Sequence, residues 1–351
     1  MFRRPLLLTV SVGILAFVTG CTKSDDGAGD GTAGSDRSIR VAYVTNGIDP
    51  FWVLAEAGVK AGAAEFGVEA EVLMPPKGLP DQKRMVETLL ARGIDGIAIS
   101  PIDAANQVQF INDACKLTHV ITQDSDAPDS DRRCFIGMDN YRAGREAGKL
   151  VKEVLPQGGK LMIFVGRLEQ LNAQQRRQGV IDELLDRPAQ ILGKGMKFDA
   201  PGFTDLRSKY LIVGTRTDNF DYANAKSNAE DAIAAHGDLA CMVGLFAYNA
   251  PNCLQAVKEA DKLAQIKIVS FDEQDATLQG IIDGHIHGTV SQQPFEYGRE
   301  SVRVLAALAR NDPSVIPPDK FLEVSAVLVR RANVQDFWAK LKRLKGLKNE
   351  G

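Results

Sequence analysis

The sequence has no excess of charge of either sign, because 42 lysines and arginines stand against 45 aspartates and glutamates and the net charge is -3. Proteins that hold nucleic acid or an anionic surface through long-range electrostatics need a basic field. The one basic stretch, within 332–351, is explained as the solvated face of a helical tail that packs on the outside of the body. We therefore expect no nucleic-acid partner.

Metal-binding patterns are also scarce. The chain has four histidines, and no two of its cysteines have the C-x-x-C spacing of a zinc site. His285 and His287 would place both imidazoles on one face of a strand, but no third ligand lies near them in the sequence. A surface strand explains this pair better than a ligand set does. We expect neither a metal nor a cofactor.

Beyond position 18 there is no long apolar run, so we expect a soluble, globular body. The one such run, 5–18, follows two arginines and leads through small residues to Cys21. At about 14 residues it is shorter than the roughly 20 that span a bilayer. A basic start, an apolar run and small residues, in this order, are typical of a secretory signal. The ending resembles a bacterial lipoprotein signal, which implies a lipid on Cys21. We expect a signal peptide over 1–20 and a flexible, Gly- and Asp-rich tether over 21–38.

Four cysteines remain besides Cys21. An even number in an oxidising compartment permits two disulfides, and four cysteines allow three pairings. Proximity in the sequence favours Cys115 with Cys134 and Cys241 with Cys253, because each pair brackets one strand–loop unit. Buried free thiols are the alternative.

From residue 39 onward, short β-branched runs alternate with amphipathic segments of helical period. The expected strands are 39–45, 68–74, 96–100, 119–123, 134–138, 160–165, 210–215, 240–245, 266–271, 288–291 and 324–329. The expected helices are 51–66, 81–92, 103–117, 140–155, 173–185, 222–235, 250–263, 276–283 and 295–310. Such alternation predicts parallel sheets covered on both faces. Because an open sheet rarely exceeds about ten strands, the expected fold class is α/β with two doubly wound parallel sheets. The irregular stretch 188–208 is expected to be a surface excursion or a functional loop.

Polar and aromatic side chains follow several of these strands at their carboxyl ends, where open parallel sheets bind ligands. They are Asn46, Asp49, Phe51 and Trp52 after the first strand, and Asp124, Gln174, Phe220, Tyr248, Asn249, Asp272 and Gln292 after later ones. Carboxylates and amides offer paired acceptors and donors to vicinal hydroxyls, and aromatic rings pack on the C–H faces of a sugar. Many Asp and Asn residues are only helix caps, but their recurrence at both sheets together with aromatic residues favours a sugar or polyol site.

The strand ends have no arrangement typical of an enzyme. A dinucleotide-binding enzyme would have G-x-G-x-x-G after the first strand, whereas residues 45–50 read TNGIDP. A glycosidase would place two carboxylates across a cleft. Asp124 and Asp272 could mimic that pair, but they are better explained as hydroxyl acceptors. We predict a binding protein and not an enzyme.

Several segments carry a resemblance to a known family. Residues 44–52 end in DPFW at the start of the first expected helix, 136–140 read IGMDN, 268–272 read IVSFD and 289–294 read TVSQQP. Together, over 39–330, they resemble the ribose-type periplasmic sugar-binding proteins, which are the type I solute-binding proteins of ABC transporters.

The resemblance implies a set of ligand contacts. They are Asp49, Phe51, Trp52 and Asp124 in the first domain, Gln174, Phe220, Asn249 and Asp272 in the second, and Gln292 at a crossing between them. The chain departs from the ribose pattern at three of its positions: Asp49 replaces an Asn, Ser125 stands where an Arg follows the carboxylate, and Gln174 stands where a second Arg is expected, although Arg176 and Arg177 are close by. The loss of both guanidiniums removes planar, bidentate donors, so the pocket type is similar and the particular sugar is left open.

The resemblance also implies two lobes joined by a three-segment hinge. The crossings would lie near 138–140, 291–293 and 323–325, with an N-terminal lobe of 39–138 and 293–323, a C-terminal lobe of 139–292 and 324–331, and a helical tail of 332–351. The expected function is that of a monomeric, lipid-anchored protein of the periplasm or cell envelope, which captures a small sugar or polyol and delivers it to an ABC permease. The alternative is a sugar-sensing receptor for a membrane signalling partner.

Overall fold

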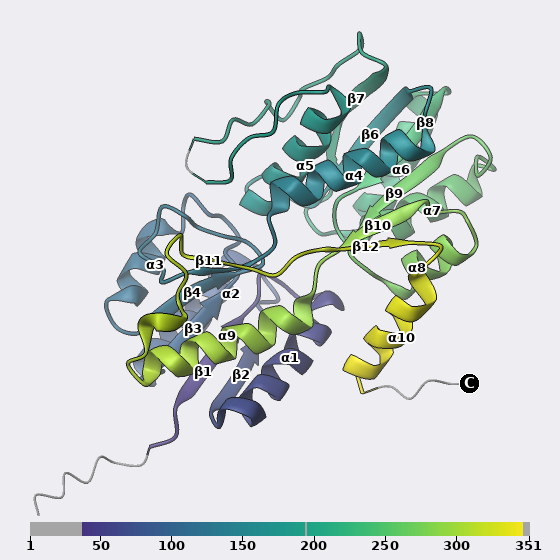
Figure 1. Ribbon diagram of the computed structural model, residues 1–351. Helices are drawn as coiled ribbons and strands as arrows, with labels where there is room; N and C mark the ends of the chain where they lie inside the picture. Colours follow the sequence, from purple (N-terminus) through teal and green to yellow (C-terminus); the bar gives the residue numbers. More distant parts are fainter. Residues whose placement is uncertain (1–36, 194, 347–351) are drawn as a thin grey trace, which may run out of the picture. The chain divides into compact units, whose positions relative to one another are not determined.

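The computed structural model describes residues 37–193 and 195–346, which form two six-stranded sheets with the same strand order (Figure 1). The first sheet is ordered β11 (Phe321–Glu323), β5 (Phe135–Gly137), β4 (His119–Gln123), β3 (Gly96–Ile99), β1 (Arg40–Val44) and β2 (Glu69–Leu73). The second is ordered β12 (Val327–Arg330), β10 (Gly288–Ser291), β9 (Lys267–Phe271), β8 (Leu239–Gly244), β6 (Gly159–Val165) and β7 (Tyr210–Thr217). All neighbours are parallel except β12, which is antiparallel to β10. The predicted signal peptide, Cys21 and most of the tether lie outside the described residues.

Helices cover both faces of each sheet. The first lobe consists of the first sheet with α1 (Phe51–Phe66), α2 (Leu79–Ala91), α3 (Val108–Cys115), α9 (Pro294–Ala309) and the short 3-10 helix η1 (Pro313–Val315). The second lobe consists of the second sheet with α4 (Asn140–Val154), α5 (Leu171–Leu184), α6 (Tyr222–Ala235), α7 (Asn249–Glu259) and α8 (Asp275–Ile282). The last helix is α10 (Val334–Leu344).

Strand β1 shows why the sheets are buried on both sides. Val41 and Tyr43 pack in a cluster with α1 and α9, while Ala42 and Val44 pack in a second cluster with α2 and α3. An uninterrupted apolar strand of this kind has no solvent-facing side and needs helices above and below it. The predicted fold class, α/β with two doubly wound parallel-sheet lobes, is confirmed.

The chain passes between the two sheets three times. It leaves the first sheet after β5 and enters α4, which packs on the second sheet. It returns between β10 and α9, and it crosses again between β11 and β12. All three passages lie at one end of the sheets, so the carboxyl ends of the strands of both lobes face a common space.

Helices α4 and α5 approach each other closely enough to require glycine. A Cβ on Gly144 would lie 2.1 Å from the carbonyl oxygen of Arg176, and a Cβ on Gly179 would lie 2.2 Å from the carbonyl oxygen of Tyr141. Any larger side chain at either position would push the helices apart. The two glycines therefore fix the depth at which Arg176 lies in the second lobe.

Besides the short helix η1 and shifts of a few residues at element ends, two elements differ from the sequence-based prediction. The third helix begins at Val108 and not near 103, because the side chain of Gln107 accepts hydrogen bonds from the backbone of Ile102 (2.7 Å) and Asp103 (2.8 Å) and holds a turn there. Strand β11 was not predicted, since three residues are too few to show a period of two. The described residues of 188–208 contain no helix or strand, and Arg177 holds this stretch by donating to the carbonyl oxygens of Asp199 and Ala200.

The predicted disulfides are wrong, because all four described cysteines are free. Cys115 packs with the α2–α3 side of the first sheet, whereas Cys134 lies on the α1–α9 side. Cys241 and Cys253 are likewise divided between the two faces of the second sheet. The two cysteines of each predicted pair are thus separated by a sheet. The thiols of Cys134, Cys241 and Cys253 are buried, as the alternative expected, and that of Cys115 is half-buried. Burial raises the pKa of Cys134 to about 11 and of Cys241 to about 12, so both thiols stay protonated.

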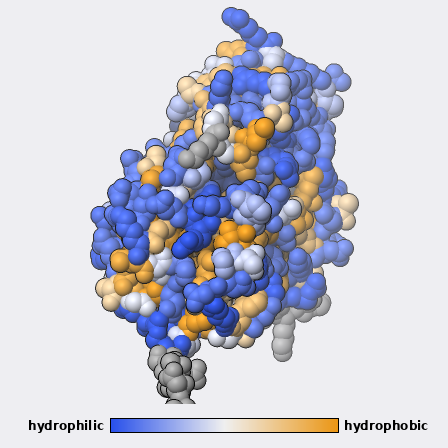
Figure 2. All heavy atoms as spheres, turned by 60° about the vertical axis from the view of Figure 1, so that its left-hand side comes forward, coloured by the Kyte–Doolittle hydropathy of each residue, from blue (hydrophilic) through white to orange (hydrophobic). Residues whose placement is uncertain are grey.

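Hydrophilic residues predominate on the face shown in Figure 2, and hydrophobic residues occur there in small groups. No helix among residues 37–193 and 195–346 combines the length and the apolar character needed to cross a bilayer.

Helix α10 packs mainly on the second lobe, where the indole of Trp338 donates to Asp275 (3.0 Å). Its apolar side also reaches the first lobe, because Phe337 and Leu341 share a hydrophobic cluster with Leu54 of α1. The predicted helical tail is therefore in contact with both lobes.

Candidate functional site

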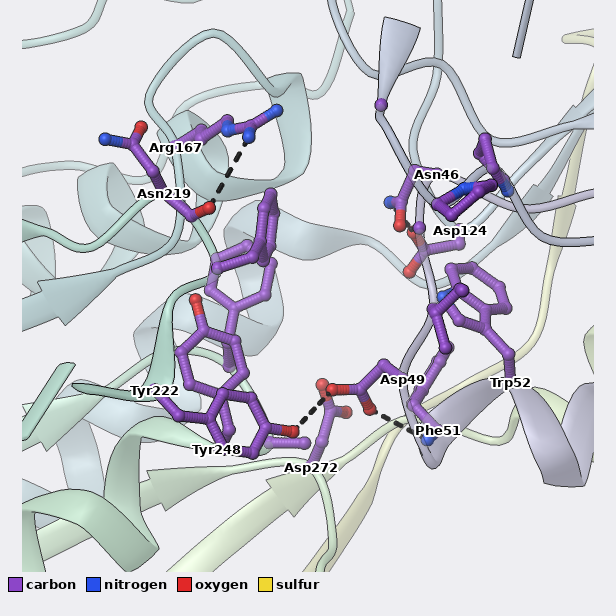
Figure 3. A pocket seen from close by; sticks show the side chains of 18 of the residues that line it. Asn46, Asp49, Phe51, Trp52, Asp124, Arg167, Asn219, Tyr222, Tyr248 and Asp272 are labelled. Carbon is purple, nitrogen blue, oxygen red and sulfur yellow. Dashed lines mark hydrogen bonds between the residues drawn. The ribbon is translucent and has the colours of Figure 1, made fainter. Parts of the chain in front are cut away.

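A cavity of about 390 Å³ lies between the two lobes at the carboxyl ends of the strands. This volume is within the range of small-molecule sites. Figure 3 shows Asn46, Phe51, Trp52 and Asp124 of the first lobe on one side and the second-lobe residue Tyr248 on the other. The cavity is therefore shared by both lobes.

The floor of the cavity has two aspartates at equivalent places in the two sheets. Asp124 follows β4 and Asp272 follows β9, and both have a backbone φ of 60°. Asp124 Oδ2 accepts from the Ser100 hydroxyl at 3.0 Å, and Asp272 accepts from the backbone and side-chain nitrogens of Gln292 at 3.0 and 2.9 Å. A left-handed backbone is costly for a non-glycine residue and concentrates at functional sites. At Asp124 and Asp272, the left-handed backbone turns the carboxylates into the space between the lobes.

Arg176 lies between these two carboxylates and is fully buried. Its Nη2 is 3.9 Å from Asp124 and its Nη1 is 3.6 Å from Asp272. Nε donates to Asn140 (2.9 Å) and Nη1 donates to the Leu245 carbonyl (3.1 Å), while Nη2 has no hydrogen-bond partner among residues 37–193 and 195–346. A buried guanidinium N–H without a partner costs free energy, so this donor is available to an acceptor in the cavity.

Burial dominates the electrostatics of the floor. It raises the pKa of Asp124 to about 6, although Arg176 and the Ser100 hydroxyl act in the opposite direction. Burial also raises the pKa of Asp272, again against the effect of Arg176. Two carboxylates that share one cation are under-compensated, and hydroxyl donors from a ligand would stabilise their charged forms.

Aromatic rings form the wall on the second lobe. The Phe220 ring meets the rings of Phe246 and Tyr248 edge-on, with centroids 5.6 and 6.1 Å apart, and Tyr222 stacks on Tyr248 at 5.0 Å. Phe220 has a φ of 64°, which is unusual for an aromatic residue. Asp218 holds this conformation, because it accepts from the backbone of Phe220 (2.9 Å) and from the hydroxyl of Tyr248.

A glycine makes room for this wall. A Cβ on Gly166 would lie 2.5 Å from the ring of Phe220. On the opposite lobe, Phe51 and Trp52 meet edge-on with ring centroids 4.8 Å apart. The cavity therefore offers ring faces and edges from both lobes, as a sugar ring requires.

A hydrogen bond joins the lobes beside the cavity. The hydroxyl of Tyr222 donates to Asp49 Oδ2 at 3.0 Å, while Asp49 Oδ1 accepts from the backbone of Phe51 at 2.8 Å (Figure 3). Burial raises the pKa of Asp49, and these two hydrogen bonds oppose that rise. Asp49 thus links the start of α1 to the aromatic wall of the other lobe.

The structure brings most of the predicted site residues to this cavity and leaves two outside it. Those that line it are Asp49, Phe51, Trp52, Asp124, Phe220, Asp272 and Gln292. Gln174 does not line it, because its amide donates to the Leu168 carbonyl at 2.6 Å. Asn249 also lies behind the wall, where it donates to Asp218 at 2.9 Å. Asn249 thus supports the aromatic wall through Asp218.

The expected loss of both guanidiniums is wrong, since Arg176 supplies one. It lies within α5, beyond the strand end, so the search for residues directly after strands missed it. Tyr222, Phe246 and Arg167 also line the cavity and were not predicted, although Arg167 and Phe246 lie only two residues after the ends of β6 and β8. Tyr248 does follow a strand and was seen there, but it was not among the contacts that the resemblance implied. Among the described residues, no group of three or more His, Cys, Asp or Glu side chains is placed to hold a metal ion.

Two α/β lobes with a polar and aromatic cavity between them define a protein that binds a small ligand by enclosing it. Residues 39–313 match the sequence profile of the periplasmic binding protein domain, and the chain belongs to this family.

Curated relatives and solved structures agree with this assignment. The D-ribose/D-allose-binding protein of Pseudomonas aeruginosa is 24% identical over 72% of this chain and 76% of its own length. The ribose import binding protein RbsB of Haemophilus influenzae is 26% identical over 72% and 80%. A solute-binding protein of Burkholderia graminis in complex with D-arabinose superposes with a TM-score of 0.73 and 26% identity, covering 84% of this chain and 96% of its own. These relatives are sugar-binding transport proteins, in agreement with the prediction of a binding protein and not an enzyme.

Proposed function

We propose that this protein captures a small sugar or polyol in the cavity between its lobes and delivers it to an ABC permease. The observation that carries the proposal is the buried Arg176 Nη2, an unpartnered donor beside the carboxylates of Asp124 and Asp272. Vicinal hydroxyls can donate to both carboxylates and accept from the guanidinium at the same time. Few neutral ligands other than a sugar carry, on one ring, hydroxyls that match these alternating donors and acceptors of the protein.

The aromatic residues complete the fit. Phe220 and Tyr248 lie on one lobe and Trp52 on the other, so a ring bound on the floor would have its C–H faces covered from both sides. Asp124 and Arg176 belong to different lobes, and a ligand that contacts both favours the arrangement in which the lobes are close. Binding would then shift the population toward the closed form, which a permease can recognise.

The remaining parts of the proposal come from the family and the N-terminal sequence. Relatives in this family bind sugars for import, which supports a location outside the cytoplasm and a permease as partner. The signal over 1–20 and a lipid on Cys21 would keep a monomeric receptor beside that permease. The tether over 21–38 would give it a reach of roughly 20 Å as a flexible coil.

The proposal is tested by thermal unfolding with a panel of pentoses, hexoses, their acids and polyols. At least one member should raise the melting temperature, because a ligand that binds only the folded state stabilises it. Asp272→Asn should weaken the affinity for that ligand by about tenfold or more, since the hydroxyls lose a charged acceptor.

The matched control is Asp113→Asn, which removes an exposed carboxylate outside the cavity that contacts Lys116 and Gln109. Its affinity should equal that of the wild type. A panel in which no member stabilises the protein would refute the capture of a sugar or polyol. Delivery is tested by uptake of the labelled ligand into cells that express either the wild type or Asp272→Asn.

A further inference from the structure

Two cations line the same cavity and have no acidic partner in the part of the chain that the structure describes. Lys77 lies between β2 and α2 in the first lobe, and Arg167 follows β6 in the second. Among residues 37–193 and 195–346, neither side chain has a carboxylate within ion-pair distance. By contrast, Arg84 of the neighbouring helix pairs with Asp81 at 2.8 Å. Two unneutralised cations that border one cavity from opposite lobes favour an anion between them.

Arg167 is held in place by uncharged groups. Its Nη2 donates to the carbonyl oxygen of Asn219 at 3.4 Å, and its guanidinium lies over the ring of Phe220 at 5.2 Å. Its Nη1 is 3.9 Å from the point where a Cβ on Gly78 would lie, so the side chain reaches across to the first lobe beside Lys77. In Figure 3 it lies on the opposite side of the cavity from Asp124. A guanidinium fixed in this way presents its remaining N–H groups to anionic oxygens without further ordering.

The floor has the opposite sign. Asp124 and Asp272 share the single guanidinium of Arg176, and Asp49 has no cation within ion-pair distance among the described residues. An acidic group on the floor would meet like charges, and the same group beside Lys77 and Arg167 would meet two unpaired cations. The charge of the lining thus changes sign from the floor to this part of the rim.

We propose that the ligand is an acidic sugar, and this inference rests on the proposed function. Its hydroxylated ring lies on the carboxylate floor, and one anionic oxygen group, a carboxylate or a phosphate ester, lies between Lys77 and Arg167. Arg167 gives this group two parallel hydrogen bonds, and Lys77 adds a point charge. The two unpaired cations thereby act as the element that selects acidic over neutral sugars.

The test is isothermal titration calorimetry of the full-length protein with matched sugars. The series are glucose with glucuronate and glucose 6-phosphate, galactose with galacturonate, and ribose with ribose 5-phosphate. At least one acid should bind about tenfold or more tightly than its neutral parent. This preference should shrink when the salt is raised from about 0.05 M to about 0.5 M. Comparison of the two uronates with the two sugar phosphates shows whether a carboxylate or a phosphate ester fits between the two cations.

The double variant Lys77→Met/Arg167→Met keeps the apolar stems and removes both charges, and it should reduce the preference to about threefold or less. Lys83→Met is the matched control, because Lys83 is exposed on α2 outside the cavity, and it should keep the wild-type preference. Neutral parents that bind as tightly as their acids would overturn the inference and leave the proposed function standing. An acid preference that survives in the double variant would overturn the role of the two cations. If no member of any series binds, the inference of an acidic sugar is overturned, while the proposed function is decided by the broader thermal-unfolding panel.

Discussion

Asp124→Asn should change how the stability of the ligand-free protein depends on pH. Burial raises the pKa of Asp124 to about 6 in the folded state, against an ordinary value of 3.8. The folded protein therefore holds this proton more tightly than the unfolded chain does. The resulting stabilisation is complete below about pH 4 and is lost as the pH rises through about 6. The difference between the two pKa values corresponds to about 3 kcal/mol of unfolding free energy.

Urea denaturation between about pH 4 and pH 7.5 measures this effect. The unfolding free energy of the wild type, relative to that of Asp124→Asn, should fall by about 2.5 kcal/mol across this range, because asparagine does not titrate and the unfolded carboxyl is already partly ionised at pH 4. Burial raises the pKa of Asp218 to about 6 and of Glu273 to about 8, but both residues are present in both proteins. The comparison therefore reports on Asp124 and on its coupling to Asp272.

The control is again Asp113→Asn. In the wild type, Lys116 lowers the pKa of the Asp113 carboxyl, so this group titrates below the measured pH range. The profile of this variant should run parallel to that of the wild type. If the profile of Asp124→Asn also runs parallel to the wild type, the floor of the cavity is hydrated or compensated in a way that excludes the burial described above.

Three further changes test other parts of the molecule. Tyr222→Phe removes the hydrogen bond to Asp49 between the lobes and should weaken ligand affinity about threefold to tenfold by calorimetry, whereas an unchanged affinity would show that this contact does not favour the closed form. Gly166→Ala should displace the ring of Phe220 and lower affinity by about tenfold or more while the circular dichroism spectrum stays that of the wild type; wild-type binding would remove Phe220 from the site. Cys21→Ala should abolish labelling with a radioactive fatty acid in growing cells, and equal labelling of both proteins would contradict the lipid anchor.

Much of the site could be predicted because parallel sheets deliver residues to a common edge. Asp124 and Asp272 each directly follow a strand of their lobe, and the rule that ligands bind beyond the carboxyl ends of strands finds both of them. Asn249 follows the same rule and still lies behind the wall, because the first residue of a helix can face the protein as well as the cavity. Position along the chain identifies the edge, but it does not identify the direction of the side chain.

Arg176 could not be predicted in this way. It lies inside α5, and its place depends on the close packing of α4 and α5 that two glycines permit. The neighbouring Arg177 turns away and holds the irregular stretch near Asp199, so even the presence of adjacent arginines does not indicate which one enters the cavity. The disulfides failed for a related reason, since proximity in the sequence cannot show on which face of a sheet a thiol packs.

The contact of α10 with both lobes makes this helix a natural position for a reporter group. Because it follows β12 of the second lobe and shares a hydrophobic cluster with Leu54 of the first, any rotation of the lobes about the hinge must slide its apolar side along α1. Lys340 lies beside this contact, in a small crevice with Pro294 and Phe295. An environment-sensitive dye at this position would change its emission as the lobes move, at a distance from the ligand. The protein could thus serve as a scaffold for an optical biosensor without alteration of the site that selects the analyte.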